Sequence, residues 1–325
     1  MIDRRHFLAG MAAAASGAWT TASAQQDFPI KPIKFVCPFP PGAGSDAISR
    51  QVSERMSRHL GQPIVVDNRA GAAGNIGLEY LSKQPPDGYT IGLISTSTAI
   101  LNPMIYRSLP YNAERDFVPV GLISSLPYVL VVNPNVPAKT LPELLALAKA
   151  KPRTLSFASP GNGHAAHLGG ELLKELGGVD MIHVPYQGSG AATNDLIGGQ
   201  TTMLFALVSD SLQLIKSGRL RAIAIPTKAR LPMLPDVPTF AESGMPDFDL
   251  TAWFGVIGVA GTPQPVLRRL NAALNQSLAE PDARKWLDDR GQEVLGGTPE
   301  AFQKLMEVER RRWAPVVKKS GVSLS

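Results

Sequence analysis

The sequence contains a single cysteine, Cys37, among 325 residues, so no disulfide can form within the chain. A fold held together by disulfides is therefore excluded. With 44% apolar residues, a chain of this length can instead be stabilised by a large core, and its length predicts about two domains. Cys37 lies in an apolar run, which favours a buried strand residue over a nucleophile.

Long apolar runs are also missing after residue 24, where none approaches the roughly 18 residues that a membrane-spanning helix needs. Residues 1–24 have the charged start, apolar middle and small-residue end of an export signal, with a cleavage motif at Ala22-Ser23-Ala24. Arg4-Arg5 resembles a twin-arginine signal, and a general secretory signal is the alternative. The sequence predicts a soluble, periplasmic mature protein that begins at Gln25.

Charged residues make up only 18% of the chain, and the formal net charge is +5. The densest basic run, "ERRRWAPVVKK", alternates with apolar residues at helical spacing, which favours a solvated helix face over a nucleic-acid-binding patch. No nucleophile elbow or evident carboxylate pair occurs, and His164 and His167 lack a third metal ligand. We therefore expect no catalytic residue, metal, cofactor or nucleic acid. Because catalytic groups can meet from distant positions, an exported α/β hydrolase or transferase stays open.

Short apolar runs bounded by turn residues alternate with helical patterns, which predicts an α/β fold with largely parallel sheets. Within the helical patterns, apolar residues four apart run from Ile48 to Leu60, and Gly61 supplies a stop. Further helix starts are expected at Thr140, Thr262-Pro263 and Thr298-Pro299. The expected strands are Ile33–Phe39, Ile64–Asp67, Tyr89–Ser95, Val129–Asn133, Leu155–Ser159, Met181–Tyr186, Thr201–Ala206, Leu220–Ile225 and Phe254–Ala260.

The elements divide into two units. Residues 25–123 and 250–325 are expected to form lobe 1, because the tail is too short for a sheet of its own. Residues 124–249, which open with "PYVLVV", are expected to form lobe 2. The two crossing segments then predict a hinge near 118–124 and 248–255.

The stretch "FPPGAGSD" joins a strand pattern to a helix pattern. Gly42 and Gly44 permit positive φ and close approach of a ligand, and Ser45 is a good N-cap residue. Free N–H groups at a helix start can bind an anion. The stretch fits neither a P-loop nor a dinucleotide fingerprint, and Asp46 would repel a pyrophosphate. A small carboxylate is the better candidate, and a plain strand-to-helix turn is the alternative.

The stretch "SPGNGH", from Ser159 to His164, repeats this pattern before the next helix. Both turns follow strands, at the sheet edge where α/β proteins bind ligands, so the two could face one cleft. Two further loops, Ala70–Gly77 and Ser95–Pro103, carry glycines or hydroxyls that turn and capping chemistry explains. A polar group near a helix start is likewise the simpler interpretation of His164.

Seven ordered blocks extend over nearly the whole mature chain: "FPPGAGSDAISR", "GQPIVVDNRAGAAGNIG", "PPDGYTI", "ASPGNGHAAHLGGEL", "HVPYQGSGAATNDLIGGQ", "LPDVPTFAESGMPDF" and "WFGVIGVAGTP". Together they resemble the periplasmic receptors of tripartite tricarboxylate transporters, also called Bug-type receptors. The resemblance implies a two-domain clamshell of the type II periplasmic-binding-protein class with a two-segment hinge. It also implies a monomer that carries a small carboxylate to the membrane subunits of a transporter, or presents it to a sensor kinase.

In such receptors the two glycine-rich loops offer main-chain N–H groups to a ligand carboxylate. This sequence departs from the pattern at His164, where Ser or Thr is frequent, and at Ala206, where an acidic residue is frequent. The loss of that acid argues for a plainer or more apolar carboxylate than an amino acid. The expected ligand-binding residues are Phe39, Gly42, Ala43, Gly44, Ser45, Asp46, Thr96, Ser159, Gly161, Asn162, Gly163, His164, Tyr186 and Ala206.

Overall fold

The computed structural model describes residues 28–186 and 188–324, so the predicted signal peptide lies outside the described part. Ten strands form a mixed sheet in the order β2-β1-β3-β9-β4-β7-β5-β6, and β8 and β10 each pair with β4. The strands are β1 (Ile33–Cys37), β2 (Ile64–Asn68), β3 (Thr90–Ser95), β4 (Phe117–Val132), β5 (Ser156–Ser159), β6 (Ile182–Pro185), β7 (Met203–Leu207), β8 (Arg221–Ala224), β9 (Thr251–Val259) and β10 (Glu293–Val294).

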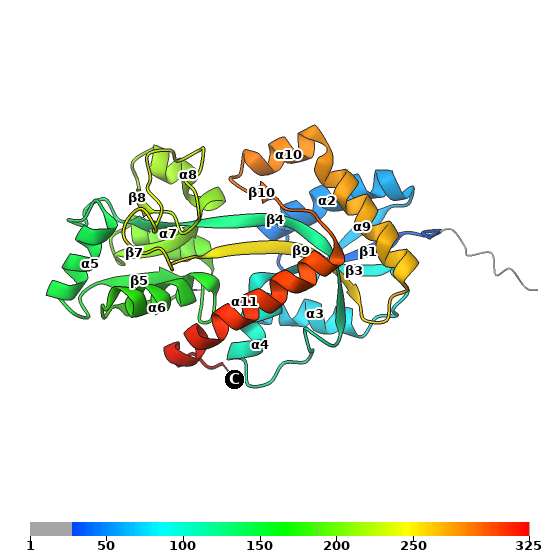
Figure 1. Cartoon of the computed structure of the whole chain (residues 1–325), viewed down its shortest axis with the longest axis horizontal. Helices are drawn as coiled ribbons and strands as arrows, with labels where there is room; N and C mark the ends of the chain where they lie inside the picture. Colours follow the sequence, from blue (N-terminus) through cyan, green and yellow to red (C-terminus); the bar gives the residue numbers. More distant parts are fainter. Residues whose placement is uncertain (1–27, 187, 325) are drawn as a thin grey trace, which may run out of the picture.

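Helices cover the sheet in both lobes (Figure 1). No helix in the described ranges is both long enough and apolar enough to cross a membrane. The helices are α2 (Gly44–Leu60), η1 (Ala72–Gly74), α3 (Asn75–Ser82), η2 (Ser97–Leu101), α4 (Asn102–Ile105), α5 (Leu141–Ala150), α6 (Ala165–Gly177), α7 (Ser189–Ile197), α8 (Val208–Lys216), α9 (Gln264–Ala279), α10 (Pro281–Asp288) and α11 (Pro299–Ser320).

Strand β4 is shared by the two lobes. Its first part, Phe117–Pro127, pairs with β9, and its second part, Tyr128–Val132, pairs with β7. Figure 1 shows β4 and β9 running side by side from one half of the molecule to the other. The change of partner falls in the "PYVLVV" segment, and both segments of the predicted hinge overlap these two strands.

The predicted alternation of strands and helices is confirmed, and every expected strand has an observed counterpart. The prediction of largely parallel sheets is wrong. Of nine strand pairs among the described residues, β1–β2, β1–β3, β5–β6 and β5–β7 are parallel and the other five are antiparallel. The reason is that β4 and β9 run in opposite directions between the lobes and insert into the middle of the sheet.

Helix α11 crosses from one lobe to the other. It packs against β4, η2 and α6, and Figure 1 shows it lying obliquely across the molecule. Its Phe302 and Trp313 are buried in a hydrophobic cluster that also contains Val36 of β1 and Phe157 of β5. Near its end, Lys319 Nζ lies 2.7 Å from a Glu175 carboxylate oxygen on α6. The C-terminal helix therefore shares one continuous core with strands from both ends of the sheet.

Helix boundaries follow the predicted signals in most places. Gly61 ends α2 with a φ of 73°, and the Thr298 hydroxyl accepts a hydrogen bond from the Ala301 N–H at 3.2 Å. The prediction of a Thr262 cap is wrong, because α9 begins one residue later than expected, with Pro263 at the N-cap position. The Thr262 hydroxyl instead donates to the Val259 carbonyl at 2.7 Å.

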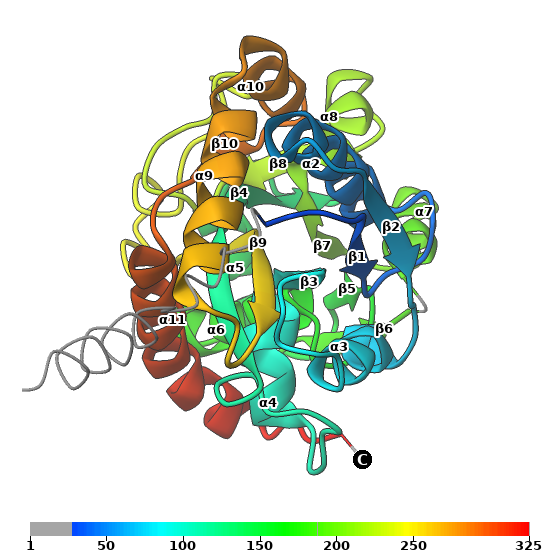
Figure 2. The ribbon, with the colours of Figure 1, turned by 90° about the vertical axis from the view of Figure 1, so that its right-hand side faces the viewer.

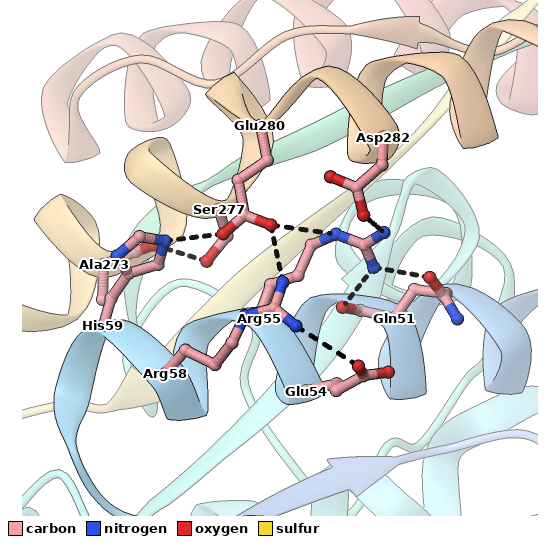
Figure 3. Close-up of polar contacts among 9 residues, drawn as sticks. All are labelled: Gln51, Glu54, Arg55, Arg58, His59, Ala273, Ser277, Glu280 and Asp282. Carbon is pink, nitrogen blue, oxygen red and sulfur yellow. Dashed lines mark hydrogen bonds and ion pairs between the residues drawn. The ribbon is translucent and has the colours of Figure 1, made fainter.

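Helix α2 is joined to the α9–α10 junction by an ion network. Figure 2 shows α2 and α9 at the lobe 1 end, and Figure 3 shows the side chains that meet between them. The buried Arg55 places its guanidinium 2.7 Å from Asp282 and 3.5 Å from Glu280. Glu280 also lies 2.6 Å from Arg58 and 2.8 Å from His59. One carboxylate thus holds three side chains of α2.

We expect the Glu280→Ala variant to lose about 2 kcal/mol of unfolding free energy, because a buried cation loses one of its two carboxylate partners. Urea unfolding at neutral pH measures this loss. Glu54→Ala is the matched control, since its partner Arg58 is exposed and the pair lies at 3.4 Å. Its effect should stay within about 0.5 kcal/mol. Equal losses in the two variants would contradict a special role of Glu280.

Candidate functional site

The loop between β1 and α2 differs from its prediction at the cap. Ala43, rather than Ser45, is the N-cap residue, and no side chain caps this helix start. Ser45 is already the second helical residue, two positions after the N-cap from which a side chain caps a helix. That hydroxyl has no hydrogen-bond partner among the described residues. The predicted capping role of Ser45 is therefore wrong, and its hydroxyl, in a buried residue, is left without a partner in the described part of the chain.

Asp46 is a structural anchor of this loop. Its carboxylate accepts hydrogen bonds from the Gly42 N–H at 3.0 Å, from Arg50 Nε at 3.1 Å and from Asn68 Nδ2 at 2.9 Å. Burial alone would raise the pKa of Asp46, but the hydrogen bonds from Arg50, Gly42 and Asn68 outweigh it and lower the pKa. Asp46 is thus ionised and fully engaged at neutral pH, and Gly42 has no free N–H to offer.

Two main-chain donors remain at the start of α2. Among the described residues, neither the Gly44 nor the Ser45 N–H has a partner, whereas the Asp46 and Ala47 N–H groups both donate to the Ala43 carbonyl. Gly44 is exposed and open space surrounds the position of its absent Cβ. These two N–H groups lie at the positive end of a helix of 17 residues, which is a suitable place for an anion.

The second loop, between β5 and α6, uses most of its polar groups internally. The Gly161 N–H donates to the Ser159 hydroxyl at 3.2 Å, and the Gly163 N–H donates to His167 Nδ1 at 3.0 Å. Of the stretch Gly161–Gly163, which was predicted to supply backbone donors, the N–H groups of Gly161 and Gly163 are thus engaged within the loop. The N–H groups of Asn162 and Ala165 have no partner among the described residues and can take that role.

Two stacked imidazole rings, those of His167 and His183, pack next to this loop. The rings of His167 on α6 and His183 on β6 are parallel within 6°, with centroids 3.6 Å apart, and Phe157 stacks on His183 at 4.9 Å. His183 Nε2 lies 2.7 Å from the Ser159 hydroxyl. Burial lowers the pKa of His167 to about 3 and that of His183 to about 4, so both rings are neutral at pH 7. The sequence analysis did not identify His183 as a site residue.

His164 caps helix α6. Its Nδ1 accepts a hydrogen bond from the Ala166 N–H at 3.1 Å, which agrees with the simpler interpretation of a polar group at a helix start. Burial lowers the pKa of His164 to about 4. Since Nδ1 of this neutral ring is an acceptor, the ring proton resides on Nε2. His164 also lines a cavity with Ala206, so two predicted site residues from different elements come together.

Other predicted site residues have structural partners. The buried Thr96 hydroxyl accepts from the Trp253 N–H of β9 at 3.0 Å, and the Phe39 carbonyl accepts from Asn68 Nδ2 at 3.1 Å. Tyr186 is half-buried; burial and the Asp195 carboxylate both raise its pKa. Within the described part of the chain, no group of three or more His, Cys, Asp or Glu side chains could hold a metal ion.

The Ala70–Gly77 loop, which was interpreted as a turn that leads into a helix, has this structure. The Ala70–Gly77 loop forms η1, with Ala73 at a φ of 55°, and leads into α3. The side chain of Asn75, the first residue of α3, accepts from Asn102 Nδ2 at 2.7 Å and from the Tyr111 hydroxyl at 3.1 Å. This buried network connects α3 to α4.

Residues 48–322 match a family model described as the tripartite tricarboxylate transporter family receptor. A protein of Pseudomonas sp. strain P51, named for the tcbD–tcbE intergenic region, is 42% identical over 97% of this chain and 94% of its own length. Protein BugT of Bordetella pertussis is 37% identical, and the alignment covers 91% of each chain. The two relatives thus match this chain over nearly its full length.

Solved structures resemble the fold closely. A Rhodopseudomonas palustris protein solved with adipate is 33% identical, with a TM-score of 0.83, over 91% of this chain and 99% of that one. MatC of the same organism, solved with bound malate, is 31% identical, with a TM-score of 0.79, over 89% of this chain and 100% of that one. The periplasmic binding protein BugD is 34% identical, with a TM-score of 0.78, over 91% of this chain and 99% of that one. The predicted fold class of a two-domain periplasmic binding protein is confirmed.

Proposed function

The chain belongs to the tripartite tricarboxylate transporter receptor family, and we propose that it binds a small organic carboxylate between lobes 1 and 2 in the periplasm and delivers it to the membrane subunits of such a transporter. The observation that carries this proposal is a pair of strand-to-helix loops with unpaired main-chain N–H groups, at Gly44–Ser45 and at Asn162. The carboxylates in the two Rhodopseudomonas palustris structures support the ligand class.

Backbone dipoles are the main source of affinity in this proposal. Neither loop contains an arginine or lysine, so the N–H groups and the dipoles of α2 and α6 take the place of a cationic side chain. In this proposal, lobe 1 consists of residues 25–123 and 250–325, and lobe 2 consists of residues 124–249. The lobes close by bending of the segments 118–124 and 248–255, which overlap β4 and β9. A carboxylate that contacts both loops stabilises the closed form, because only that form brings the loops to one ligand.

The first experiment is a thermal-shift screen of the mature protein against mono-, di- and tricarboxylates and aromatic acids. A ligand at 100 times its dissociation constant stabilises the fold by about 2.7 kcal/mol, which raises Tm by several degrees. Calorimetry then gives the affinity of the best acid. Consumption of the acid during the measurement would favour an exported hydrolase or transferase instead, and a screen without any stabilising carboxylate would overturn the proposal.

Removing one donor at the start of α2 should weaken carboxylate binding about 10-fold to 100-fold, since a hydrogen bond to a charged group contributes about 1.5–3 kcal/mol. Gly44→Pro makes this change cleanly. Proline is well tolerated at the first helical position, Ala43 already has the extended conformation that precedes proline, and no atom lies within 4 Å of the new Cβ.

Ser45→Ala is the matched control, because it removes only a hydroxyl and keeps both N–H groups. We expect it to weaken binding less than about 5-fold, which corresponds to about 1 kcal/mol. Calorimetry on the acid selected by the screen measures both variants. A stronger effect of Ser45→Ala than of Gly44→Pro would show that the side chain, rather than the backbone, binds the anion.

A further inference from the structure

A small cavity in lobe 2 contains an acidic side chain that the sequence interpretation missed. The cavity measures about 70 Å³. One water needs roughly 10–15 Å³ of such volume, so the space holds several waters or the end of a small ligand. We call it the distal cavity. It is lined by Tyr128, Pro160, His164, Ser189, Thr193, Leu204, Phe205, Ala206, Leu207 and Asp210.

Asp210 lies in the first turn of α8, four residues after Ala206 at the end of β7. Its Oδ1 accepts a hydrogen bond from the Ser209 hydroxyl at 3.0 Å, and its Oδ2 has no hydrogen-bond partner among the described residues. Asp210 is exposed to solvent at its outer side, and the protein around its carboxyl raises its pKa, which the hydrogen bond from the Ser209 hydroxyl only partly offsets. The cavity is therefore acidic although position 206 is alanine.

The other polar groups of the distal cavity are neutral. His164 holds its Nδ1 in the helix cap, so the ring can present only its Nε2–H to the cavity. Tyr128 is buried, and burial together with the charge of Asp210 raises its pKa, which keeps the phenol protonated. No described residue that lines the cavity is a lysine or arginine. A second carboxylate on a ligand would face Asp210 with no cation between them.

We propose that the distal cavity binds the far end of the ligand and selects a hydroxyl or ammonium group there over a second carboxylate, with Asp210 as the specificity-determining residue. This rests on the proposed function, in which the two glycine-rich loops hold the near carboxylate. A hydroxyl or ammonium donates to the free Oδ2, whereas a carboxylate is repelled by the negative charge of Asp210, because no cationic side chain of the described residues lines the cavity. From Ala206 alone we expected a plainer, more apolar ligand. With Asp210 in the cavity, we instead propose a carboxylate whose far end carries a hydroxyl or ammonium group.

A matched ligand series tests this. Calorimetry compares hexanoate, 6-hydroxyhexanoate, 6-aminohexanoate and adipate, and then the corresponding acids of four carbons, on the full mature protein. We expect the hydroxy or amino acid to bind at least about 10-fold tighter than the dicarboxylate of the same length. In Asp210→Asn, which keeps the shape and removes the charge, that ratio should fall about 10-fold, with the dicarboxylate gaining affinity.

Asp236→Asn is the control, because it makes the same charge change at an exposed position of lobe 2 that does not line the cavity. It should leave the ranking unchanged. If acids of either series bind but dicarboxylates bind best, or Asp210→Asn leaves the ranking unaltered, the assignment of the distal cavity is wrong and the receptor function stands. If no carboxylate of these series or of the screen binds, the proposed function itself fails.

Discussion

We expect the Gly163→Val variant to lose about 3–5 kcal/mol of unfolding free energy and about 5–8 °C in Tm. Two costs add at this position. Gly163 has a φ of 76°, a conformation that strains a β-branched residue. A Cβ placed there would lie 2.0 Å from Cδ1 of Ile105 and 3.4 Å from Cδ1 of Leu324, so the second loop could not keep its contact with α4 and the chain end.

This contact is relevant to ligand binding because it joins the two lobes beside the proposed site. Ile105 ends α4 in lobe 1, and Leu324 donates its N–H to the Ile105 carbonyl at 2.7 Å. Gly163 belongs to the loop of lobe 2 that is proposed to bind the anion. A displaced loop should also move the Asn162 N–H, so we expect weaker carboxylate binding in addition to lower stability.

A control and a rescue separate the two costs. Gly178→Val has a comparable φ of 61° at the glycine but meets nothing within 4 Å, so its loss measures strain without the clash. The rescue starts from Gly163→Ala and adds Ile105→Val, which deletes the Cδ1 methyl that the new Cβ would meet. The pair should be more stable than the sum of its single effects by about 1 kcal/mol or more. Additive effects would show that the clash is not the cause.

The local structure of the chain could be predicted where one short segment determines it. Apolar spacing and Gly61 located α2, because a helix face and a left-handed end depend on neighbouring residues only. The start of α2 was less predictable. Ala43 and Ser45 differ by two residues, and the hydrogen bond from Gly42 to Asp46 favours the earlier start. The antiparallel pairs of β4 and β9 depend on contacts across more than 120 residues, which no local pattern reveals.

The contacts within the candidate site were also not predictable from local sequence patterns. The glycine-rich loops were visible as repeated motifs, yet the partners of their N–H groups were not. His183 reaches Ser159 from the next strand, and Asp210 reaches the distal cavity from the helix after β7. Both are single polar residues in ordinary apolar or helical surroundings. The position of Asp210, four residues after Ala206, was the one signal that could have revealed a displaced acid.

The stacked pair of His167 and His183 should make the fold less stable as the pH falls from about 6.5 to 4.5. Both histidines have a lower pKa in the folded chain, about 3 and about 4, than the value near 6.5 of an unfolded chain. In this window the unfolded chain binds more protons than the folded one, so the unfolding free energy decreases with falling pH. Each neutral ring contributes a slope of about 1.4 kcal/mol per pH unit, or about 4 kcal/mol for the pair over the window.

The physical cause is burial first, with nearby positive charge second. A proton on either ring would place a cation against the other ring at 3.6 Å, and Lys174 on α6 adds to the repulsion. Glu171 of the same helix lies 3.9 Å from His167 Nε2, too far to compensate by a hydrogen bond. The stacked pair therefore supports the second loop only while both rings are neutral.

His183→Phe tests this by keeping an aromatic ring in contact with Phe157 and His167 while removing one titrating group. Urea unfolding at several pH values between 4.5 and 7 should give a slope reduced by about 1.4 kcal/mol per pH unit relative to the native chain. Phe157→Leu is the packing control: it should lower stability at every pH and leave the slope unchanged. A native slope in His183→Phe would mean that the stacked histidines do not carry the pH dependence, whatever their role in packing.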